Sequence, residues 1–228
     1  MHPQQIKLAL GMPYKNDAEF LSWTLQKIPP TFDRYIFIDT GSTDGSTNLI
    51  MARFPDAIII KDELPYIDFA QWRNDIMARA EQEACDWVFM LDSDETIFTG
   101  AYELLRKYAN SNSSTLYRVA RIDFTGKDVI TYAHYPDWQA RLIKCNEGYQ
   151  YAPRIHAQPC INGETIQGVF IPHIVIYHYG WTRDAHYKTL HYYNADRSLQ
   201  GLESVNELPP DVPLITHKDT LPFYGEQP

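Results

Sequence analysis

The sequence is poor in cysteine and has no long apolar run, and each shortage limits what the protein can be. Its three cysteines, Cys85, Cys145 and Cys160, are odd in number, far apart and in no metal-ligand spacing. We therefore expect reduced thiols in a cytoplasmic protein. No apolar run approaches the roughly 20 residues that cross a bilayer, and the first residues lack the pattern of a signal peptide. We expect no transmembrane segment, which leaves peripheral membrane association open.

Basic residues are outnumbered in this chain. Lys and Arg total 20 against 29 Asp and Glu, which gives a formal net charge of −9. An acidic chain repels polyphosphates at long range, so we expect no binding to nucleic acid. The Gly-x-Gly-x-x-Gly pattern of dinucleotide-binding enzymes is missing after the first apolar segment, which argues against a dehydrogenase of that kind. Aromatic residues are plentiful, and their flat faces suit sugar and base sites as well as a tyrosine-rich core.

Apolar strands and amphipathic helices alternate in the first half of the sequence. Predicted strands cover residues 6–12, 35–38, 57–60 and 87–91, and predicted helices begin near Asp17, Ser46 and Asp68, with both aspartates suited to capping. This alternation predicts an α/β protein with a mainly parallel, Rossmann-like sheet flanked by helices. Ligands of such sheets bind beyond the carboxyl ends of the strands. Asp39 and Asp92 follow two of those ends.

The second half of the sequence is less regular. Predicted strands cover residues 116–123, 129–133, 141–144, 154–158 and 174–179, and a predicted helix covers 184–199. His186 and His191 are expected on the surface of that helix. Residues 203–228 are rich in proline and have few periodic apolar positions. We predict an extended tail there that wraps the body or stays partly loose.

Two carboxylates close together follow the last strand of the first half. Asp92 and Asp94 flank Ser93 directly after an all-apolar strand, and both can face one cation. Carboxylates suit a hard divalent ion such as Mg²⁺ or Mn²⁺, which can bridge diphosphate oxygens. The pattern alone also fits solvated surface carboxylates.

A polar turn follows the second predicted strand. Asp39 ends that strand, and its carboxylate can accept a hydrogen bond from a base or a ribose. Residues 40–45 are Thr, Gly, Ser, Thr, Asp and Gly, which provide a tight turn and a helix cap. A plain strand-to-helix turn explains the same residues equally well.

Several short motifs occur together in a recognisable order and spacing. They are residues 9–17 (ALGMPYKND), 38–44 (IDTGSTD), 68–74 (DFAQWRN), 91–95 (LDSDE), 139–143 (QARLI), 154–156 (RIH) and 178–180 (HYG). This series resembles glycosyltransferase family 2, especially members that decorate bacterial surface glycans. The resemblance implies a GT-A fold in residues 1–202. Its nucleotide-sugar-binding half would cover residues 1–115, and a smaller, mixed acceptor-side region would cover residues 116–202.

The resemblance also implies a reaction and a set of site residues. The reaction is inverting transfer of a sugar, expected to be a hexose, from a UDP-sugar to a glycan or lipid-linked glycan, with Mn²⁺ or Mg²⁺. The nucleotide sugar would lie against Pro13, Asn16, Asp39, Asp44, Asp68, Arg73, Asp92 and Ser93. The metal would bind Asp92, Asp94 and His178. The acceptor or the diphosphate would be held by Trp138, Arg141, Arg154 and His156.

Inverting transfer needs a general base that takes the proton of the acceptor hydroxyl. Asp137 is the first candidate, and an ordinary loop aspartate is the alternative reading of this residue. Asp123 and Glu95 are held in reserve. Three positions depart from the family pattern: Asp17 stands where Glu is commoner, Trp72 stands where a small residue is usual, and Ala157 stands where Glu is frequent.

Other acceptor-side assignments also have alternatives. Arg141 and Arg154 fit surface salt bridges as well as an anion site. Trp138, Tyr179 and Trp181 fit a stacking platform for the acceptor as well as plain core packing.

Two further readings compete with a glycosyltransferase. A sugar-phosphate nucleotidyltransferase uses a similar fold and a divalent ion, but its first loop is rich in glycine and contains arginine, unlike residues 11–15 here. A nucleotide-sugar or glycan-binding module without catalysis is the non-enzymatic alternative.

Overall fold

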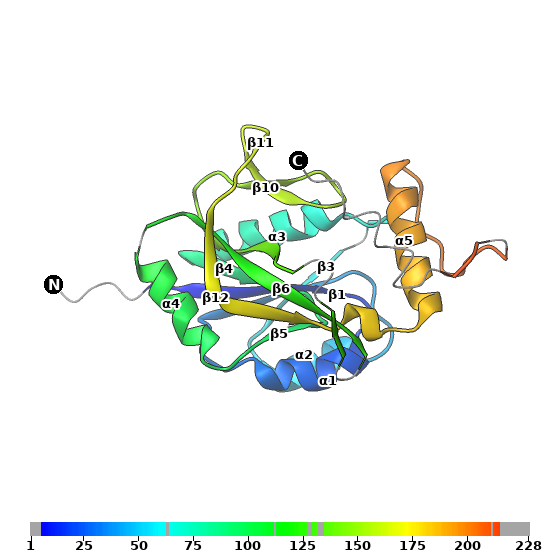
Figure 1. Ribbon diagram of the computed structural model, residues 1–228, viewed down its shortest axis with the longest axis horizontal. Helices are drawn as coiled ribbons and strands as arrows, with labels where there is room; N and C mark the ends of the chain where they lie inside the picture. The colour runs from blue at the N-terminus through cyan, green and yellow to red at the C-terminus, as the bar shows by residue number, and fades with distance from the viewer. Residues whose placement is uncertain are drawn as a thin grey trace.

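The computed structural model describes residues 6–62, 64–111, 113–126, 129–131, 135–210 and 212–214. Within these residues the central feature is a nine-stranded sheet with the order β3-β2-β1-β4-β8-β6-β12-β5, and β7 pairs with β6 at one side. Helices cover both faces of this sheet (Figure 1). The expected fold class, an α/β protein with a parallel central region flanked by helices, is confirmed.

The first half contains the parallel strands and the helices that connect them. The strands are β1 (Leu8–Tyr14), β2 (Arg34–Asp39), β3 (Ile58–Lys61) and β4 (Trp87–Met90), and the helices are α1 (Ala18–Lys27), α2 (Ser46–Arg53) and α3 (Phe69–Gln82). β1 pairs in parallel with both β2 and β4, and β2 pairs in parallel with β3. β1 and β4 are almost wholly buried because helices lie on both faces, which explains their continuous apolar runs.

Alternate residues of each strand enter two separate cores. Leu8 and Leu10 of β1 belong to the core under α1, α2 and α4 (Ala101–Ser111). Ala9, between them, belongs to the core under α3. Figure 1 shows α1 and α2 side by side, with α3 beyond the strands. The period of two follows from the pleat of the strand.

The remaining strands of the same sheet run in mixed directions. These are β5 (Glu95–Ile97), β6 (Leu116–Gly126), β7 (Val129–Thr131), β8 (Asp137–Lys144) and β12 (Val169–His178). β8 lies antiparallel between β4 and β6, while β12 runs parallel to β6. The 3-10 helix η1 (Gly180–Thr182) follows β12. The sequence did not predict β5 or α4.

A small second sheet corrects one prediction. It consists of β9 (Gln150–Ala152), β10 (Gln158–Ile161) and β11 (Glu164–Thr165). The predicted strand at residues 154–158 is wrong, because residues 153–156 bend and His156 has a φ of 57°. That left-handed backbone breaks the extended geometry that a strand requires.

The last helix is α5 (Ala185–Leu199), and its predicted start is confirmed because the Asp184 side chain accepts a hydrogen bond from the Tyr187 amide. Residues 203–206 return toward the body without regular secondary structure. Asn194 binds both backbone groups of Val205, at 2.8 and 3.0 Å, and the Ser204 amide donates to the Pro65 carbonyl at 2.6 Å. The rest of the expected tail, residue 211 and residues 215–228, lies outside the described residues, and the division into a domain and a tail stays a prediction.

The cysteines and the expected lack of a transmembrane segment can both be compared with the described residues. Their three cysteines are buried and free of disulfides. No helix in the described part of the chain has the length and apolar character needed to cross a bilayer.

Candidate active site

The polar loops that follow β1, β2 and β4 meet at one edge of the sheet. β1 lies between the other two strands, and the register places Tyr14 of β1 opposite Asp39 of β2. Asp92 follows β4 at the same edge, because β4 is parallel to β1. The structure therefore brings together the two acidic segments that the sequence placed in one site.

Asp39 is fully buried and holds the turn that follows β2. Its Oδ1 accepts hydrogen bonds from the amides of Gly41 and Ser42, at 3.2 and 2.7 Å. Its Oδ2 accepts one from Thr47 at 3.1 Å and pairs with Lys61. Burial opposes ionisation, but these hydrogen bonds outweigh it and lower the pKa of Asp39 to about 2. The carboxylate thus orders the loop, with both oxygens occupied.

Asn16 and Asp44 join the loops after β1 and β2. Asn16 has a φ of 50°, and its side-chain oxygen accepts a hydrogen bond from the Thr43 amide at 2.7 Å. Asp44 accepts from the amides of Ala18 and Ser46, at 2.9 and 3.0 Å. Both predicted nucleotide contacts therefore shape the rim of the site through their side chains. Pro13 is a half-buried residue of β1 on the same rim.

A cleft of about 180 Å³ lies beside this rim. Its lining comes from the loops after β1, β2 and β3, from α3 and from residues 204 and 206; it includes Lys15, Thr40, Asp62, Tyr66, Trp72 and Ser204. Trp72 donates a hydrogen bond from its indole nitrogen to Asp62 at 2.5 Å. The large residue that departs from the family pattern therefore forms a wall of the cleft.

Asp92 is bound by two arginines. Its Oδ1 lies 3.3 Å from Arg73 Nη2, and its Oδ2 lies 3.0 Å from Arg141 Nη2. Arg141 also lies 2.6 Å from Glu95, whose other carboxylate oxygen accepts the Asp92 amide at 2.9 Å. Burial opposes ionisation of Asp92, but Arg141 and Arg73 hold its pKa well below the usual range.

The structure corrects two assignments in this cluster. Arg141 is 1% exposed, so it cannot hold the acceptor or lie in a surface salt bridge as the sequence suggested. Its guanidinium instead fixes the loop between β4 and β5. Glu95 is fully buried, and burial raises its pKa, so it supports the Asp92 backbone rather than reaching an acceptor hydroxyl.

Asp94 and His178 face each other across the ends of β4 and β12. Asp94 Oδ1 lies 3.7 Å from His178 Nε2, and the opposite ring nitrogen, Nδ1, lies 2.6 Å from Asp123 Oδ1. Burial opposes ionisation of Asp94, but His178 and Arg183 hold its pKa below the usual value. Carboxylate to histidine to metal is a common arrangement, in which the outer carboxylate orients the imidazole.

The backbone of Gly180 packs closely against these two groups. A Cβ atom on Gly180 would lie 2.4 Å from His178 Nε2 and 2.9 Å from Asp94 Oδ2. A side chain at position 180 would therefore displace His178 or Asp94. One carboxylate and one imidazole suit Mn²⁺.

Asp94 and His178 provide only a small set of donor atoms for a metal ion. The described residues contain no group of three or more acidic, histidine or cysteine side chains arranged for one metal ion. The residues fit an ion held by Asp94 and His178 that takes its remaining ligands from a diphosphate and water, as Mg²⁺ and Mn²⁺ sites on phosphates do. Asp92, the third predicted ligand, already has both carboxylate oxygens on arginines.

Sequence reasoning missed two residues of the site. Arg183 Nη2 lies 2.7 Å from Asp17 Oδ1 and 3.3 Å from Asp94 Oδ2. Asp17 was predicted to cap α1, but its side chain makes no cap hydrogen bond and accepts one from the Ser93 hydroxyl at 2.5 Å instead. The only signal in the sequence was an arginine five residues after the histidine of the HYG motif.

Asp137, the candidate base, lies at the start of β8. Its Oδ2 is 2.6 Å from Arg121 Nη2, and its Oδ1 accepts a hydrogen bond from Gln139 at 2.7 Å. Its side chain is 23% exposed, against 9% for the reserve candidate Asp123, which is engaged with His178. The structure thus holds Asp137 in a fixed position with part of its carboxylate in solvent.

Among the described residues, Asp68, Arg154 and His156 form no hydrogen bond or ion pair with His178 or the carboxylates that follow β4, but the Arg154 guanidinium lies 4.3 Å from the ring of Tyr66 in the cleft wall. Asp68 accepts a hydrogen bond from the Gln71 amide as the expected cap of α3, and it pairs with Arg154 at 3.2 Å. Arg154 also donates to the Ser198 carbonyl on α5, at 2.7 Å. His156 is exposed on the bend that follows.

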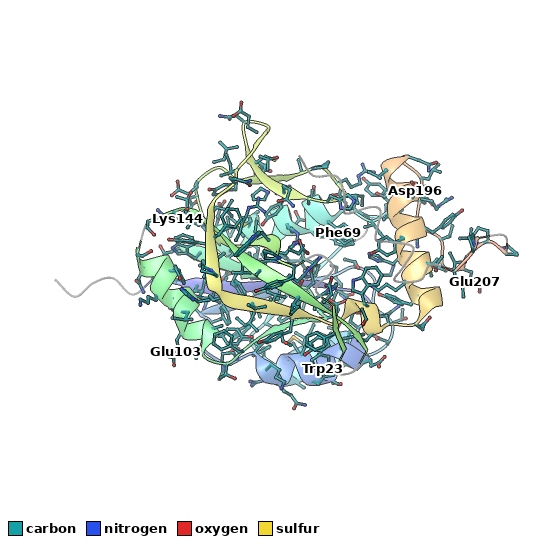
Figure 2. All side chains as sticks on the ribbon, viewed as in Figure 1. Trp23, Phe69, Glu103, Lys144, Asp196 and Glu207 are labelled. Atoms are coloured by element: carbon teal, nitrogen blue, oxygen red, sulfur yellow. The ribbon has the colours of Figure 1, made fainter. Side chains whose placement is uncertain are left out.

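The three aromatic residues of the expected acceptor platform belong to separate clusters, so the structure does not support one platform. Trp138 packs against Phe170 at 4.8 Å, and Trp181 lies over Tyr192 at 6.3 Å. Tyr179 contacts Trp23 of α1, which is labelled in Figure 2, at 4.8 Å.

His191 does not lie where the sequence predicted it. His191 was expected on the surface of α5, but its ring packs 5.8 Å from the ring of Phe69 on α3. Burial, with Lys188 and Arg183 nearby, lowers its pKa to about 4. The helix surface that carries His191 therefore faces the body, as the side chains of α5 pack on α3.

The fold and these side chains define an α/β protein with a densely charged site at the carboxyl edge of its sheet. The chain is 23% identical over 182 residues to the SPbeta prophage-derived glycosyltransferase SunS of Bacillus subtilis (strain 168), and equally to glycosyltransferase SunS of Bacillus phage SPbeta. The chain is therefore a distant homologue of glycosyltransferases, which confirms the resemblance. The match covers 76% of this chain and 40% of each relative, so the chain spans about two fifths of their length. No family model matches the chain.

Solved glycosyltransferase structures are similar in part. S. aureus TarS 1-349 in complex with UDP-GlcNAc has a TM-score of 0.46 and 17% identity, covering 57% of this chain and 38% of that chain. Glucosyl-3-phosphoglycerate synthase from Mycobacterium tuberculosis, in complex with Mn²⁺, UDP and glucosyl-3-phosphoglycerate, has a TM-score of 0.40 and 17% identity, covering 51% and 44%.

Proposed function

We propose that this protein is an inverting glycosyltransferase that moves a sugar, most simply a hexose, from a UDP-sugar to a hydroxyl group of a glycan or lipid-linked glycan. The observation that carries the proposal is the meeting of Asp94 and His178 beside the loops of Asp39 and Asp92, at the edge where such sheets bind ligands. The sequence similarity to SunS supports it independently.

The chemical demand of the reaction fits these residues. The acceptor oxygen attacks the anomeric carbon, its proton passes to a carboxylate, and the bond to the diphosphate breaks as UDP leaves. Negative charge grows on the leaving diphosphate. Asp94 and His178 would hold a Mn²⁺ or Mg²⁺ ion, which would neutralise that charge when bound. Arg73, 13% exposed beside Asp92, is a further cation near the same edge.

Asp137 is the residue we assign as the general base. Arg121 and Gln139 fix its carboxylate, and its exposed part can receive a proton. Asp123 is assigned a positioning role instead, because His178 holds it. The cleft beside Trp72 and Thr40 is the assigned place of the nucleoside.

The test uses the full chain and a panel of nucleotide sugars. Thermal shift is measured with UDP-, GDP- and ADP-sugars, each with Mn²⁺, Mg²⁺ or EDTA, because a ligand of the native state raises its melting temperature. UDP release is then measured with and without glycan acceptors. We expect a rise in melting temperature and UDP release with UDP-sugars and a metal ion, and loss of turnover in Asp94→Asn. Asp196→Asn, a change on α5 away from the site, is the control.

Each alternative predicts a distinct result. Pyrophosphate release from UTP and a sugar phosphate would identify a nucleotidyltransferase. Binding of a UDP-sugar without release of UDP under any acceptor condition would identify a binding module. Turnover that EDTA leaves unchanged would disprove the metal role of Asp94 and His178.

A further inference from the structure

Arg183 lies against the carboxylate that would bind the metal ion. Its Nη2 and Nε atoms are 3.3 and 3.4 Å from Asp94 Oδ2, and the side chain is 10% exposed. The rings of Phe20 and Tyr187 lie 4.1 and 4.7 Å from its guanidinium carbon. A guanidinium stays charged at every ordinary pH, so this place in the site carries a permanent positive charge.

Arg183 and Asp94 are held in place by different contacts. The shortest contact of Arg183 is with Asp17 Oδ1, at 2.7 Å. Asp17 is held in turn by the Ser93 hydroxyl at 2.5 Å. The main chain of Asp94 is fixed separately, because its carbonyl accepts a hydrogen bond from the Tyr179 amide at 2.9 Å. Asp94 Oδ2 also accepts long hydrogen bonds from Arg183 Nη2 and Nε, at 3.3 and 3.4 Å, so charge and these two contacts together connect the side chains.

This charge has opposite effects on two ligands. A divalent cation that binds Asp94 meets the positive charge of Arg183 on the same carboxylate, and like charges in a partly buried site repel strongly. A diphosphate group brings negative charge, which the same guanidinium attracts. A cation alone is therefore opposed by Arg183, whereas a cation with a diphosphate is not.

We propose that Arg183 makes cation binding at Asp94 depend on the nucleotide diphosphate: it weakens binding of the cation alone, and the diphosphate removes this penalty. The inference rests on the proposed function, because it uses the same cation site. Coupling of this kind is reciprocal, so the cation strengthens nucleotide binding by the same factor. Arg183 thereby acts as a positioning residue that keeps the site ready for the complete donor.

The experiment measures Mn²⁺ affinity without turnover. Free Mn²⁺ is followed by electron paramagnetic resonance as it is titrated into the full chain, with and without UDP. We expect Arg183→Gln to bind Mn²⁺ alone at least about tenfold more tightly than the wild type, since a unit charge close to the ion is removed. UDP should then enhance Mn²⁺ binding less in the variant than in the wild type.

A matched control removes the same charge elsewhere. Arg106 of α4 pairs with Asp33 at 2.9 Å, and its side chain is 25% exposed. Arg106→Gln should keep the wild-type affinity for Mn²⁺ with and without UDP. A tightening in Arg106→Gln equal to that in Arg183→Gln would overturn the inference, because net charge alone would explain it.

A second variant guards against misfolding. Arg183→Gln leaves the buried Asp17 carboxylate unpaired, which is costly. The double variant Asp17→Asn/Arg183→Met removes both charges and keeps a long side chain between the rings of Phe20 and Tyr187. It should still bind Mn²⁺ alone more tightly than the wild type, but by less than Arg183→Gln, because the negative charge of Asp17 is lost as well. Unchanged or weaker Mn²⁺ binding in either folded variant, checked by circular dichroism, overturns the inference.

The results separate this inference from the proposed function. Tighter Mn²⁺ binding in the variants, with a UDP effect but no sugar transfer, supports the role of Arg183 and counts against the transferase. Sugar transfer by the wild type, with unchanged Mn²⁺ affinity in the variants, supports the transferase and overturns the role of Arg183. A wild type that binds no Mn²⁺ even with UDP overturns both.

Discussion

Asp123 holds His178 through the ring nitrogen that faces away from Asp94. The two residues are direct partners in the parallel pairing of β6 and β12, and Asp123 Oδ1 lies 2.6 Å from His178 Nδ1. Asp123 holds the Nδ1 atom, so the opposite ring nitrogen, Nε2, is directed toward Asp94, 3.7 Å away. The sheet register itself therefore fixes the orientation of the imidazole that we propose as a metal ligand.

Replacing Asp123 should weaken metal binding. In Asp123→Ala the imidazole loses the partner that holds its orientation, and losses of such partners cost about 10–100-fold in metal affinity. We expect that loss for Mn²⁺ measured in the presence of UDP. Asp196→Asn serves as the control for a lost carboxylate. An Asp123→Ala variant with the wild-type Mn²⁺ affinity would show that the contact has no part in metal binding.

A methyl group at position 180 should block the site with little cost to the fold. The new Cβ would lie 2.4 Å from His178 Nε2 and 2.9 Å from Asp94 Oδ2, so both side chains have to move. A displacement of about 1 Å at a reacting site costs on the order of 100-fold in rate, and we expect that loss of UDP-sugar turnover in Gly180→Ala. Gly100→Ala is the matched control, because its Cβ would meet only the ring of Phe98, at 3.3 Å. Equal activity in both variants would contradict the assignment of the site.

Loss of Arg141 should destabilise the whole domain. The arginine is 1% exposed and pairs with both Asp92 and Glu95, so Arg141→Leu removes the nearest cation from the fully buried Glu95 and leaves Asp92 with Arg73 alone. Breaking a buried ion pair from one side costs about 3–5 kcal/mol in the free energy of unfolding. Urea unfolding measures this cost. The exposed pair of Arg34 and Glu83 offers a comparison, and Arg34→Gln should cost no more than about 1 kcal/mol. Similar losses in the two variants would contradict the structural role of Arg141.

Acidification should weaken the attachment of α5 through His191. Burial, with the charges of Lys188 and Arg183, lowers the pKa of His191 from 6.5 to about 4. Between these two pH values the unfolded chain binds a proton at His191 and the folded chain does not, so the free energy of unfolding falls as the pH falls. The loss reaches at most about 3 kcal/mol near pH 4.

The matched variant for this pH effect is His191→Phe, which keeps a ring against Phe69. Urea unfolding of both proteins is measured at several pH values from 7.5 down to 4. The difference in unfolding free energy between wild type and variant should change across the window between 6.5 and 4. A constant difference over this window would rule out titration of His191.

The sequence predicted the parallel half of the fold because that half is built from local signals. The strands β1 to β4 are short apolar runs, and α3 begins at a capping aspartate, Asp68. β10 and β11 escaped prediction because they are short, and β11 is exposed, so no apolar alternation marks it. β5 is only three residues long and follows the acidic motif without a break.

The sequence by itself determined which residues end the parallel strands, and hence that acidic side chains would gather at one edge of the sheet. Only the tertiary structure decided how their charges are balanced. Arg141 pairs with Glu95, which is 46 residues away in the sequence, and Arg183 pairs with Asp94, which is 89 residues away. These pairs form because β8 lies beside β4 and because the turn after β12 brings Arg183 to Asp94. No local pattern in the sequence predicts either placement.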